Sequence, residues 1–162
     1  MGTLPGECLP RPATAILWPP GKADVSLRIG FTCGTFDLLH PGHVLMLADA
    51  KGHCDSLVVG LQIDPSVDRP EKHAPVQTLE ERIMVLQAIR FVDDIKIYRT
   101  EEDLVALLKA LKPDLRIIGS DWRGKAYTGM ELDIPIYWHE RGHTWSTSEL
   151  RRRVTQRGQP DG

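Results

Sequence analysis

An apolar run that leads into a short loop with two histidines constrains the fold of this 162-residue chain more than any other feature. Residues 27–31 have the composition of a buried strand, and residues 44–50 have the apolar spacing of a helix. The segment between them, residues 33–43, reads Cys-Gly-Thr-Phe-Asp-Leu-Leu-His-Pro-Gly-His. Its Pro41 suits the first position of a helix, where a missing N–H costs nothing. This order predicts a strand, a tight turn and the start of a helix.

The two histidines of this loop, His40 and His43, point to the binding of a phosphate group. They lie at the expected helix start, where backbone N–H groups and the helix dipole favour an anion. Gly34 and Gly42 allow the backbone to approach a ligand closely. A zinc site is the alternative, since His-x-x-His can place two ligands on one helical face, but no nearby Cys or Glu has the spacing of a third ligand. Phosphate binding is therefore the prediction.

Strand-like and helix-like segments alternate along the chain. Near-continuous apolar strands between amphipathic helices predict an α/β fold: a single Rossmann-like domain with a parallel sheet of about five strands and helices on both faces. In such sheets the ligand binds beyond the carboxyl ends of the strands. Strands are expected at residues 27–32, 56–63, 94–98, 115–119 and 134–138, and helices at residues 42–51, 78–89, 101–111 and 147–154.

Composition limits the partners and the compartment. Residues 1–25, rich in proline, are expected to form a partly disordered arm, residues 26–157 the folded domain, and residues 158–162 a frayed tail. A net charge of −2 gives no support to nucleic acid or a membrane as the main partner, and the apolar runs are too short to cross a bilayer. The three cysteines are odd in number and have no CxxC spacing, so they do not suggest a disulfide framework. The sequence also shows no signal-peptide pattern, and both features favour a reducing cytoplasm.

Two other nucleotide folds fit the sequence poorly. No Gly-x-Gly-x-x-Gly follows the first expected strand, so the fingerprint of a dinucleotide-binding fold is missing. Residues 119–125 approach a P-loop, but Ala126 follows Lys125 where magnesium binding needs Ser or Thr. A P-loop NTPase is therefore rejected.

Three motifs in order resemble the HxGH-type nucleotidyltransferase superfamily, in its cytidylyltransferase-like branch. Residues 34–43 are similar to its first motif, residues 119–125 to a loop of glycerol-3-phosphate cytidylyltransferases, and residues 141–148 to their RTxGISTT segment. The last segment departs from that pattern at Gly142, Thr144 and Trp145. The resemblance spans about residues 28–153, and residues 64–72 are also similar to heptose-phosphate nucleotidyltransferases, which use ATP.

The resemblance implies transfer of CMP from CTP to a phosphorylated small alcohol such as glycerol 3-phosphate, with release of pyrophosphate. The alternative is an adenylyltransferase that uses ATP with a sugar phosphate or FMN. A third hypothesis is a non-catalytic nucleotide-binding or scaffold protein. The resemblance further implies a homodimer, Mg²⁺ that accompanies the nucleotide and is bound near Asp37, and no organic cofactor.

Several basic and hydroxyl side chains extend the expected site. Arg82 lies in the first turn of a helix, where a cation opposes the dipole, which suggests a phosphate partner. Lys72 lies in a loop that could close over the reacting phosphate, with Arg69 as a competing candidate. The resemblance and these features together assign catalysis to His40, His43, Lys72 and Arg141; nucleotide binding to Gly34, Thr35, Phe36, Asp37, Gly42, Gly119, Asp121, Trp122, Ser146, Thr147 and Ser148; and the acceptor phosphate to Arg82 and Arg69.

Overall fold

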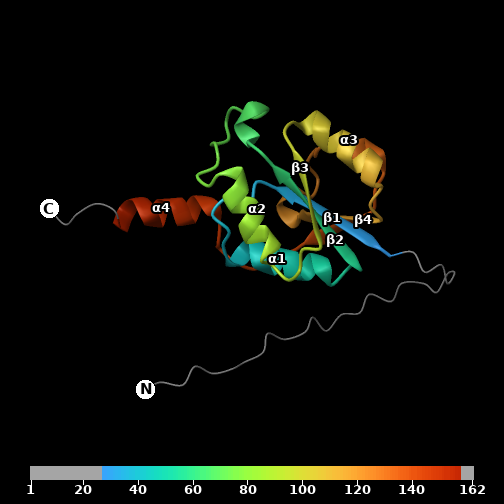
Figure 1. Cartoon of the computed structure of the whole chain (residues 1–162), viewed down its shortest axis with the longest axis horizontal. Coiled ribbons are helices and arrows are strands. Elements are labelled where there is room, and N and C mark those ends of the chain that lie inside the picture. The colour runs from blue at the N-terminus through green and yellow to red at the C-terminus, as the bar shows by residue number, and fades with distance from the viewer. Residues whose placement is uncertain (1–26, 158–162) are drawn as a thin grey trace, which may run out of the picture.

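A five-stranded, fully parallel sheet forms the centre of the protein (Figure 1). The computed structural model describes residues 27–157, so the expected N-terminal arm and C-terminal tail lie outside the described residues. The strands are β1 (Ile29–Gly34), β2 (Ser56–Gln62), β3 (Asp94–Tyr98), β4 (Leu115–Gly119) and β5 (Ile136–His139). The α-helices are α1 (Pro41–Lys51), α2 (Leu79–Gln87), α3 (Glu101–Leu111) and α4 (Thr147–Arg157), and short 3-10 turns occupy Pro65–Val67, Ser120–Trp122 and Met130–Leu132.

Helices cover both faces of the sheet, which confirms the predicted α/β architecture. Helices α1 and α2 pack on one face, where Leu47 and Leu86 are fully buried against the sheet. Helix α3 packs on the other face through Leu104 and Leu108 (Figure 1). Two hydrophobic clusters, one on each side of the strands, therefore hold the layers together.

The strand order β3-β2-β1-β4-β5 places β1 in the middle and makes it the point where the chain changes direction across the sheet. After β1 the chain runs outward through β2 and β3, then returns to the other side of β1 with β4 and β5. The connections that leave the carboxyl ends of β1 and β4 therefore diverge and open a crevice between them. Ligands of open parallel sheets bind at such a switch point.

The observed boundaries differ from the expected ones by a few residues. Strand β1 begins and ends two residues later than predicted, and β5 begins after Pro135, whose carbonyl accepts a hydrogen bond from Arg116 N–H. The predicted capping box of α2 is present, with Thr78 Oγ1 accepting from Glu81 N–H and the Glu81 carboxylate accepting from Thr78 N–H. Helix α4 continues to Arg157 and projects away from the sheet (Figure 1).

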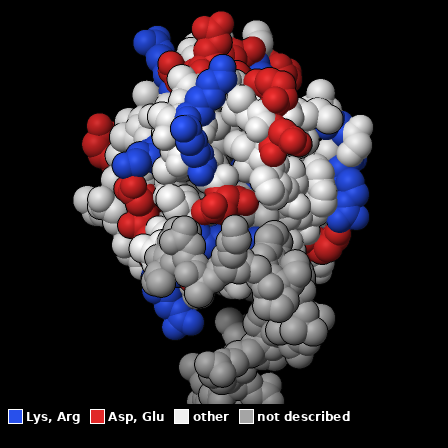
Figure 2. Space-filling model, turned by 90° about the vertical axis from the view of Figure 1, so that its right-hand side faces the viewer, with Lys and Arg blue, Asp and Glu red and all other residues white. Residues whose placement is uncertain are grey.

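The surface has no single dominant charge on the face in Figure 2, where basic and acidic side chains are interspersed. This distribution agrees with the small net charge. Within residues 27–157, no helix has the length and apolar character needed to cross a bilayer.

The buried face of α2 can be tested with a matched pair of substitutions. Leu86 is fully buried, whereas Met84 on the same helix is 71% exposed. We expect Leu86→Ala to lower the free energy of unfolding by about 2–5 kcal/mol, because it leaves a cavity in the core. Met84→Ala should change it by less than about 0.5 kcal/mol. Urea denaturation of both variants measures the difference, and equal effects would contradict the assigned packing.

Candidate functional site

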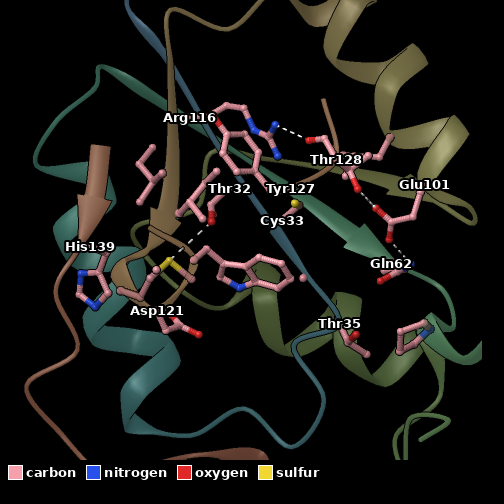
Figure 3. Close-up of a pocket in the computed structure, with 18 of the residues that line it drawn as sticks. Thr32, Cys33, Thr35, Gln62, Glu101, Arg116, Asp121, Tyr127, Thr128 and His139 are labelled. Atoms are coloured by element: carbon pink, nitrogen blue, oxygen red, sulfur yellow. Dashed lines mark hydrogen bonds between the residues drawn. The ribbon is translucent and has the colours of Figure 1, made fainter. Parts of the chain in front are cut away.

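A cavity of about 710 Å³ opens at the carboxyl ends of the strands, where the sheet topology places a ligand site. It is lined by residues from the ends of β1, β2, β4 and β5 and from the start of α1 (Figure 3). Its charged lining residues are four cations and two carboxylates, an excess of positive charge that suits an anionic ligand. These residues are Arg69, Lys72, Arg116 and Arg141, with Glu101 and Asp121.

The loop between β1 and α1 has an unusual backbone that local contacts hold in place. Phe36 and Leu38 both have positive φ, at 50° and 48°, a conformation that residues with side chains rarely adopt. The Phe36 ring is buried in the core and lies 5.3 Å from the His43 ring. The Leu38 N–H donates to the side-chain oxygen of Gln77 at 2.7 Å. The fold thus fixes the loop that carries the two motif histidines.

His40 and His43 stack on each other at the start of α1. Their ring centroids are 3.9 Å apart with an interplanar angle of 20°. The His40 N–H donates to His43 Nδ1 over a long 3.4 Å, so Nδ1 acts as the acceptor and Nε2 carries the proton of a neutral ring. His43 lines the cavity together with Gly34, Thr35 and Gly42. His43 is thereby arranged to donate a hydrogen bond to a ligand.

Burial keeps both rings neutral in the free protein. Burial, with smaller contributions from His40 and Arg141, lowers the pKa of His43 to about 3. Burial also lowers the pKa of His40, reinforced by the charges of Arg141 and His143. A bound polyphosphate would oppose these shifts because a nearby negative charge favours the protonated ring. Binding of an anion would therefore raise the pKa of both rings.

Backbone amides contribute less to this anion site than the sequence suggested. Pro41 has no N–H, and the His43 N–H already donates to the His40 carbonyl at 2.9 Å. An alanine Cβ at position 42 would lie 2.5 Å from His143 and 3.0 Å from His40. Gly42 therefore lets three imidazoles gather at the helix start, and the side chains, more than the amides, form the site.

His143 is a member of this group to which sequence reasoning assigned no role. Both of its ring nitrogens are buried and have no hydrogen-bond partner. The same is true of His40 Nδ1. Its ring lies 5.2 Å from that of Trp145. The sequence offered one signal, because His143 lies next to Gly142 and two residues from Arg141 in the third motif, but nothing in the spacing brings it to the first motif.

Side chains that hydrogen-bond to one another form the side of the cavity next to the carboxyl end of β2. Arg69 donates to Gln62 at 2.8 Å and pairs with Glu101 at 3.1 Å. Glu101 also accepts from Gln62 and from the Thr128 hydroxyl. The buried Arg116 donates to the Thr128 carbonyl at 2.7 Å. These residues, apart from Arg69, lie outside the predicted site, because the fold brings four separate segments together.

The opposite side of the cavity lies at the ends of β4 and β5. Gly119, Asp121 and Trp122 line it, and Arg141 lies there with its guanidinium 3.9 Å from the Asp121 carboxylate. Their binding of a nucleotide stays a prediction. Figure 3 shows Asp121 and His139 on this side and Glu101 across from them. A Cβ at position 119 would lie 2.5 Å from the Asp121 carboxylate, which is the end of an exposed side chain that could move aside.

Lys72 reaches the cavity from the loop after β2. It lines the site and is exposed, and its N–H donates to the Arg69 carbonyl at 2.8 Å. The structure therefore brings both basic residues of this loop to the cavity. Their catalytic and acceptor-binding roles stay predictions.

Arg82 does not have the arrangement expected for an acceptor-phosphate ligand. It is 2% exposed, and its guanidinium donates to the carbonyls of Thr35, Gln62 and Ile63 at 2.7–2.9 Å. Its Nε donates to the Thr78 carbonyl. The position of Arg82 in the first turn of a helix suggested a phosphate partner. Its partners are instead backbone carbonyls, so Arg82 ties α2 to the ends of β1 and β2.

Asp37 fits magnesium poorly. One carboxylate oxygen accepts from Val76 N–H at 3.0 Å and Gln77 N–H at 2.9 Å, and the other pairs with Arg151 at 2.6 Å. Burial raises the pKa of Asp37, but hydrogen bonds from Gln77, Arg151 and Val76 outweigh burial and bring it below its usual value. Within residues 27–157 no group of three potential acidic, histidine or cysteine ligands is arranged for a metal. The protein residues therefore do not form the proposed metal site at Asp37.

The hydroxyl residues at the start of α4 serve the helix and the loop and do not line the cavity. Ser146 Oγ accepts from Glu149 N–H at 3.1 Å and caps α4. Thr147 Oγ1 donates to the Asp37 carbonyl at 3.1 Å. Ser148 is exposed, and Phe36 belongs to the core. For these residues the structure shows a supporting position, and direct contact with a nucleotide stays a prediction.

The role of Asp37 can be tested by its neutral isostere. Asp37→Asn should lower the free energy of unfolding by about 2–4 kcal/mol, because it leaves the guanidinium of Arg151 without its buried partner. Asp94→Asn is the control, since Asp94 forms an exposed pair with Lys96 and should change stability by less than about 1 kcal/mol. Thermal and urea unfolding provide the measurement. An unchanged stability in Asp37→Asn would contradict the anchoring role.

The neutral state of His43 makes a second prediction, about pH. A ring whose pKa is about 6.5 when unfolded and about 3 when folded takes up a proton on unfolding between these values, so its contribution lowers stability as the pH falls through this window. We expect His43→Asn to reduce the slope of unfolding free energy against pH between pH 4 and 6 by up to about 1.4 kcal/mol per pH unit. Parallel slopes for the two proteins would show that burial does not depress this pKa.

Comparison with known proteins agrees with the motifs and with the fold. Residues 31–153 match the family model described as cytidylyltransferase-like. Bifunctional protein HldE from Gluconacetobacter diazotrophicus is 43% identical over 109 residues, which is 65% of this chain and 22% of that protein. HldE from Bradyrhizobium sp. is 43% identical over 138 residues, 81% of this chain and 28% of that protein. The chain thus spans about a quarter of the length of these relatives.

Solved structures share the same architecture at low sequence identity. A lipopolysaccharide core biosynthesis protein from Thermoplasma volcanium superposes with a TM-score of 0.53 at 22% identity, covering 82% of this chain and 90% of that one. A pantoate-beta-alanine ligase from Francisella tularensis gives a TM-score of 0.52 at 17% identity, covering 80% and 69%. The family model covers most of the described residues and all three motifs. The chain belongs to the cytidylyltransferase-like family and is a nucleotidyltransferase.

Proposed function

We propose that the protein transfers AMP from ATP to a sugar phosphate and releases pyrophosphate. The proposal rests on one observation: the cavity has two chemically different sides, with His43 between them. The β4–β5 side offers Trp122 and a glycine-containing loop, and the β2 side offers paired basic and acidic groups. A volume of about 710 Å³ is within the range of small-molecule sites and suits two substrates side by side.

The nucleotide fits the switch point between β1 and β4. His43 would donate Nε2–H to a phosphate oxygen, and Arg141 would add a full positive charge near the same anion. Trp122, 38% exposed at the cavity, offers an aromatic face against which a base could stack. The loop from Gly119 to Trp122 borders this part of the cavity.

The acceptor fits the β2 side of the cavity. Arg69 and Lys72 supply positive charge for its phosphate, and both line the cavity. Glu101 and Gln62 place carboxylate and amide oxygens beside them, which are suitable hydrogen-bond partners for hydroxyl groups. This mixture of charge and hydroxyl-binding groups supports a phosphorylated polyol or sugar as the acceptor.

The proposed reaction needs charge neutralisation more than proton transfer. An oxygen of the acceptor phosphate attacks the α-phosphorus of the nucleotide, a new P–O bond forms, and the bond to the pyrophosphate leaving group breaks. An ionised phosphate is already a nucleophile. The protein therefore has to align two anions that repel each other and to stabilise charge on the equatorial and leaving oxygens. His40, His43, Lys72 and Arg141 are the residues proposed for this task.

Magnesium enters the proposal as part of the nucleotide substrate. Mg²⁺ commonly binds substrate phosphates, retains waters and takes only one or two protein carboxylates. Asp37 is committed to hydrogen bonds and an ion pair, so it is not proposed again as a ligand. The homodimer implied by the family resemblance also stays a prediction.

Two observations support ATP and a sugar phosphate over CTP and glycerol 3-phosphate. The loop that supplies Arg69 and Lys72 is the segment that resembles ATP-using heptose-phosphate nucleotidyltransferases. The two curated relatives described above, at 43% identity, are both named bifunctional protein HldE. The loop at residues 119–125 still resembles that of glycerol-3-phosphate cytidylyltransferases, so CTP with glycerol 3-phosphate is the second candidate.

A substrate matrix tests the proposal. Pyrophosphate release is measured with ATP or CTP, each combined with heptose phosphates, hexose phosphates, glycerol 3-phosphate or FMN. We expect the highest kcat/KM with ATP and a sugar phosphate. A preference for CTP with glycerol 3-phosphate would select the second candidate. Nucleotide binding without turnover for every pair would favour a non-catalytic role.

The catalytic assignments predict losses of rate in variants that still fold. His43→Asn should lower kcat by about 10²-fold, because it removes a donor to the transition state but retains an acceptor for the His40 N–H. Lys72→Ala should lower kcat/KM by about 10-fold or more through loss of a charge-assisted hydrogen bond.

Lys109→Ala is the matched control for Lys72→Ala. Lys109 is an exposed lysine on α3 that does not line this cavity. Both lysine variants should keep the melting temperature of the parent protein, because neither side chain is buried. Equal activity of the two variants would remove Lys72 from the proposed machinery.

A further inference from the structure

A buried histidine in the cavity has a partner on only one side of its ring. His139 is 7% exposed and lies at the end of β5. Its Nδ1 is 2.6 Å from the carboxylate of Asp49 on α1, whereas Nε2 is buried and has no hydrogen-bond partner. His139 also lines the cavity, which makes its unpaired nitrogen a candidate contact for a ligand.

Asp49 fixes the tautomer of this ring. An ionised carboxylate only accepts hydrogen bonds, so Nδ1 of His139 carries a proton and is the donor, and in the neutral form of the ring Nε2 is an acceptor. Asp49 also accepts from the Tyr137 hydroxyl at 3.1 Å. His53 stacks on Tyr137 with ring centroids 3.8 Å apart and contacts the Asp49 carbonyl at 2.8 Å. Neighbours on two elements thus hold Asp49 and the orientation of His139.

The position of His139 places this acceptor at the base end of the proposed nucleotide site. In the sheet it is in register with Gly119, and it shares the β4–β5 side of the cavity with Asp121 (Figure 3). Its partner Asp49 lies six residues after His43, which is about 9 Å along the axis of α1. His43 and the carboxylate that holds His139 thus lie toward opposite ends of α1.

We propose that His139 Nε2 accepts a hydrogen bond from the exocyclic amino group of the nucleotide base, and so selects amino bases over their keto counterparts. This inference rests on the proposed nucleotide site. An unsatisfied buried acceptor costs free energy until a donor reaches it. Adenine and cytosine both present such a donor, whereas hypoxanthine and uracil present a carbonyl oxygen at the same place. A carbonyl opposite Nε2 would leave two acceptors facing each other.

Matched nucleotide pairs separate this role from a structural one. The ratio of kcat/KM for ATP over ITP is measured for the parent protein and for His139→Leu, and CTP over UTP is measured in the same way. The first pair tests adenine and the second tests cytosine. We expect the parent to prefer the amino member of the pair it uses by about ten-fold or more, and His139→Leu to bring that ratio close to one.

His53→Leu is the control because His53 contacts the same Asp49 and Tyr137 but does not line the cavity. It should keep the parental ratio even if it lowers stability. His139→Gln serves as a second variant if His139→Leu does not fold, and its amide, which can both donate and accept, should also weaken the preference. An unchanged ratio in a folded, active His139 variant would overturn the proposal, as would a parent protein that prefers ITP or UTP.

Failure of the proposed function would look different. If no acceptor supports pyrophosphate release, equilibrium binding of the same nucleotide pairs by calorimetry decides the inference, with the same expected ratio of dissociation constants. Absence of any nucleotide binding would overturn both. Turnover with an unaltered ratio in the His139 variants would overturn only the assignment of base recognition.

Discussion

The buried carboxylate of Asp37 holds together the parts of the protein on which the site depends. It lies in the β1–α1 loop, accepts hydrogen bonds from Val76 and Gln77, and pairs with Arg151 of α4. These contacts join the histidine loop to the segment that follows Lys72 and to a helix that otherwise projects from the sheet (Figure 1). Three regions far apart in sequence are therefore positioned by one side chain, which explains why an acidic residue is buried in the loop that carries the motif histidines.

The sheet topology explains how one cavity can serve two anions. Because β1 is central and the chain reverses across it, the loops after β1, β2 and β4 converge on one edge from different directions. His43 stands between the two sides. Cations are distributed on both sides, with Arg69 and Lys72 toward β2 and Arg141 toward β5. In the proposed reaction, these cations would oppose the repulsion between the two substrates on each side separately, which a single basic cluster would do less well.

Local sequence patterns predicted the layers and the histidine loop but not the long-range partners. Apolar strands, the Thr78 capping box and the His40-x-x-His43 spacing are short-range signals, and the fold contains each of them. Arg82 was misjudged because its position against the helix dipole was visible, whereas the carbonyls of Thr35 and Gln62 that accept its hydrogen bonds lie 47 and 20 residues away. The same limit hid the pairing of Arg69 with Glu101, 32 residues apart.

The residues that sequence reasoning missed come from separate elements, whereas the predicted motif is continuous in sequence. The histidines proposed to bind phosphate lie together at the start of α1. The groups proposed to face the base or the acceptor come from the ends of several strands. His139 illustrates the difference, because its ring becomes informative only when Asp49, 90 residues earlier, is seen to hold Nδ1 and leave Nε2 unpaired in the cavity. A histidine in an apolar strand is otherwise indistinguishable from one that packs in the core. His139 lies across the cavity from the paired Arg69 and Glu101, so in the proposed function different strands would recognise the base and the acceptor.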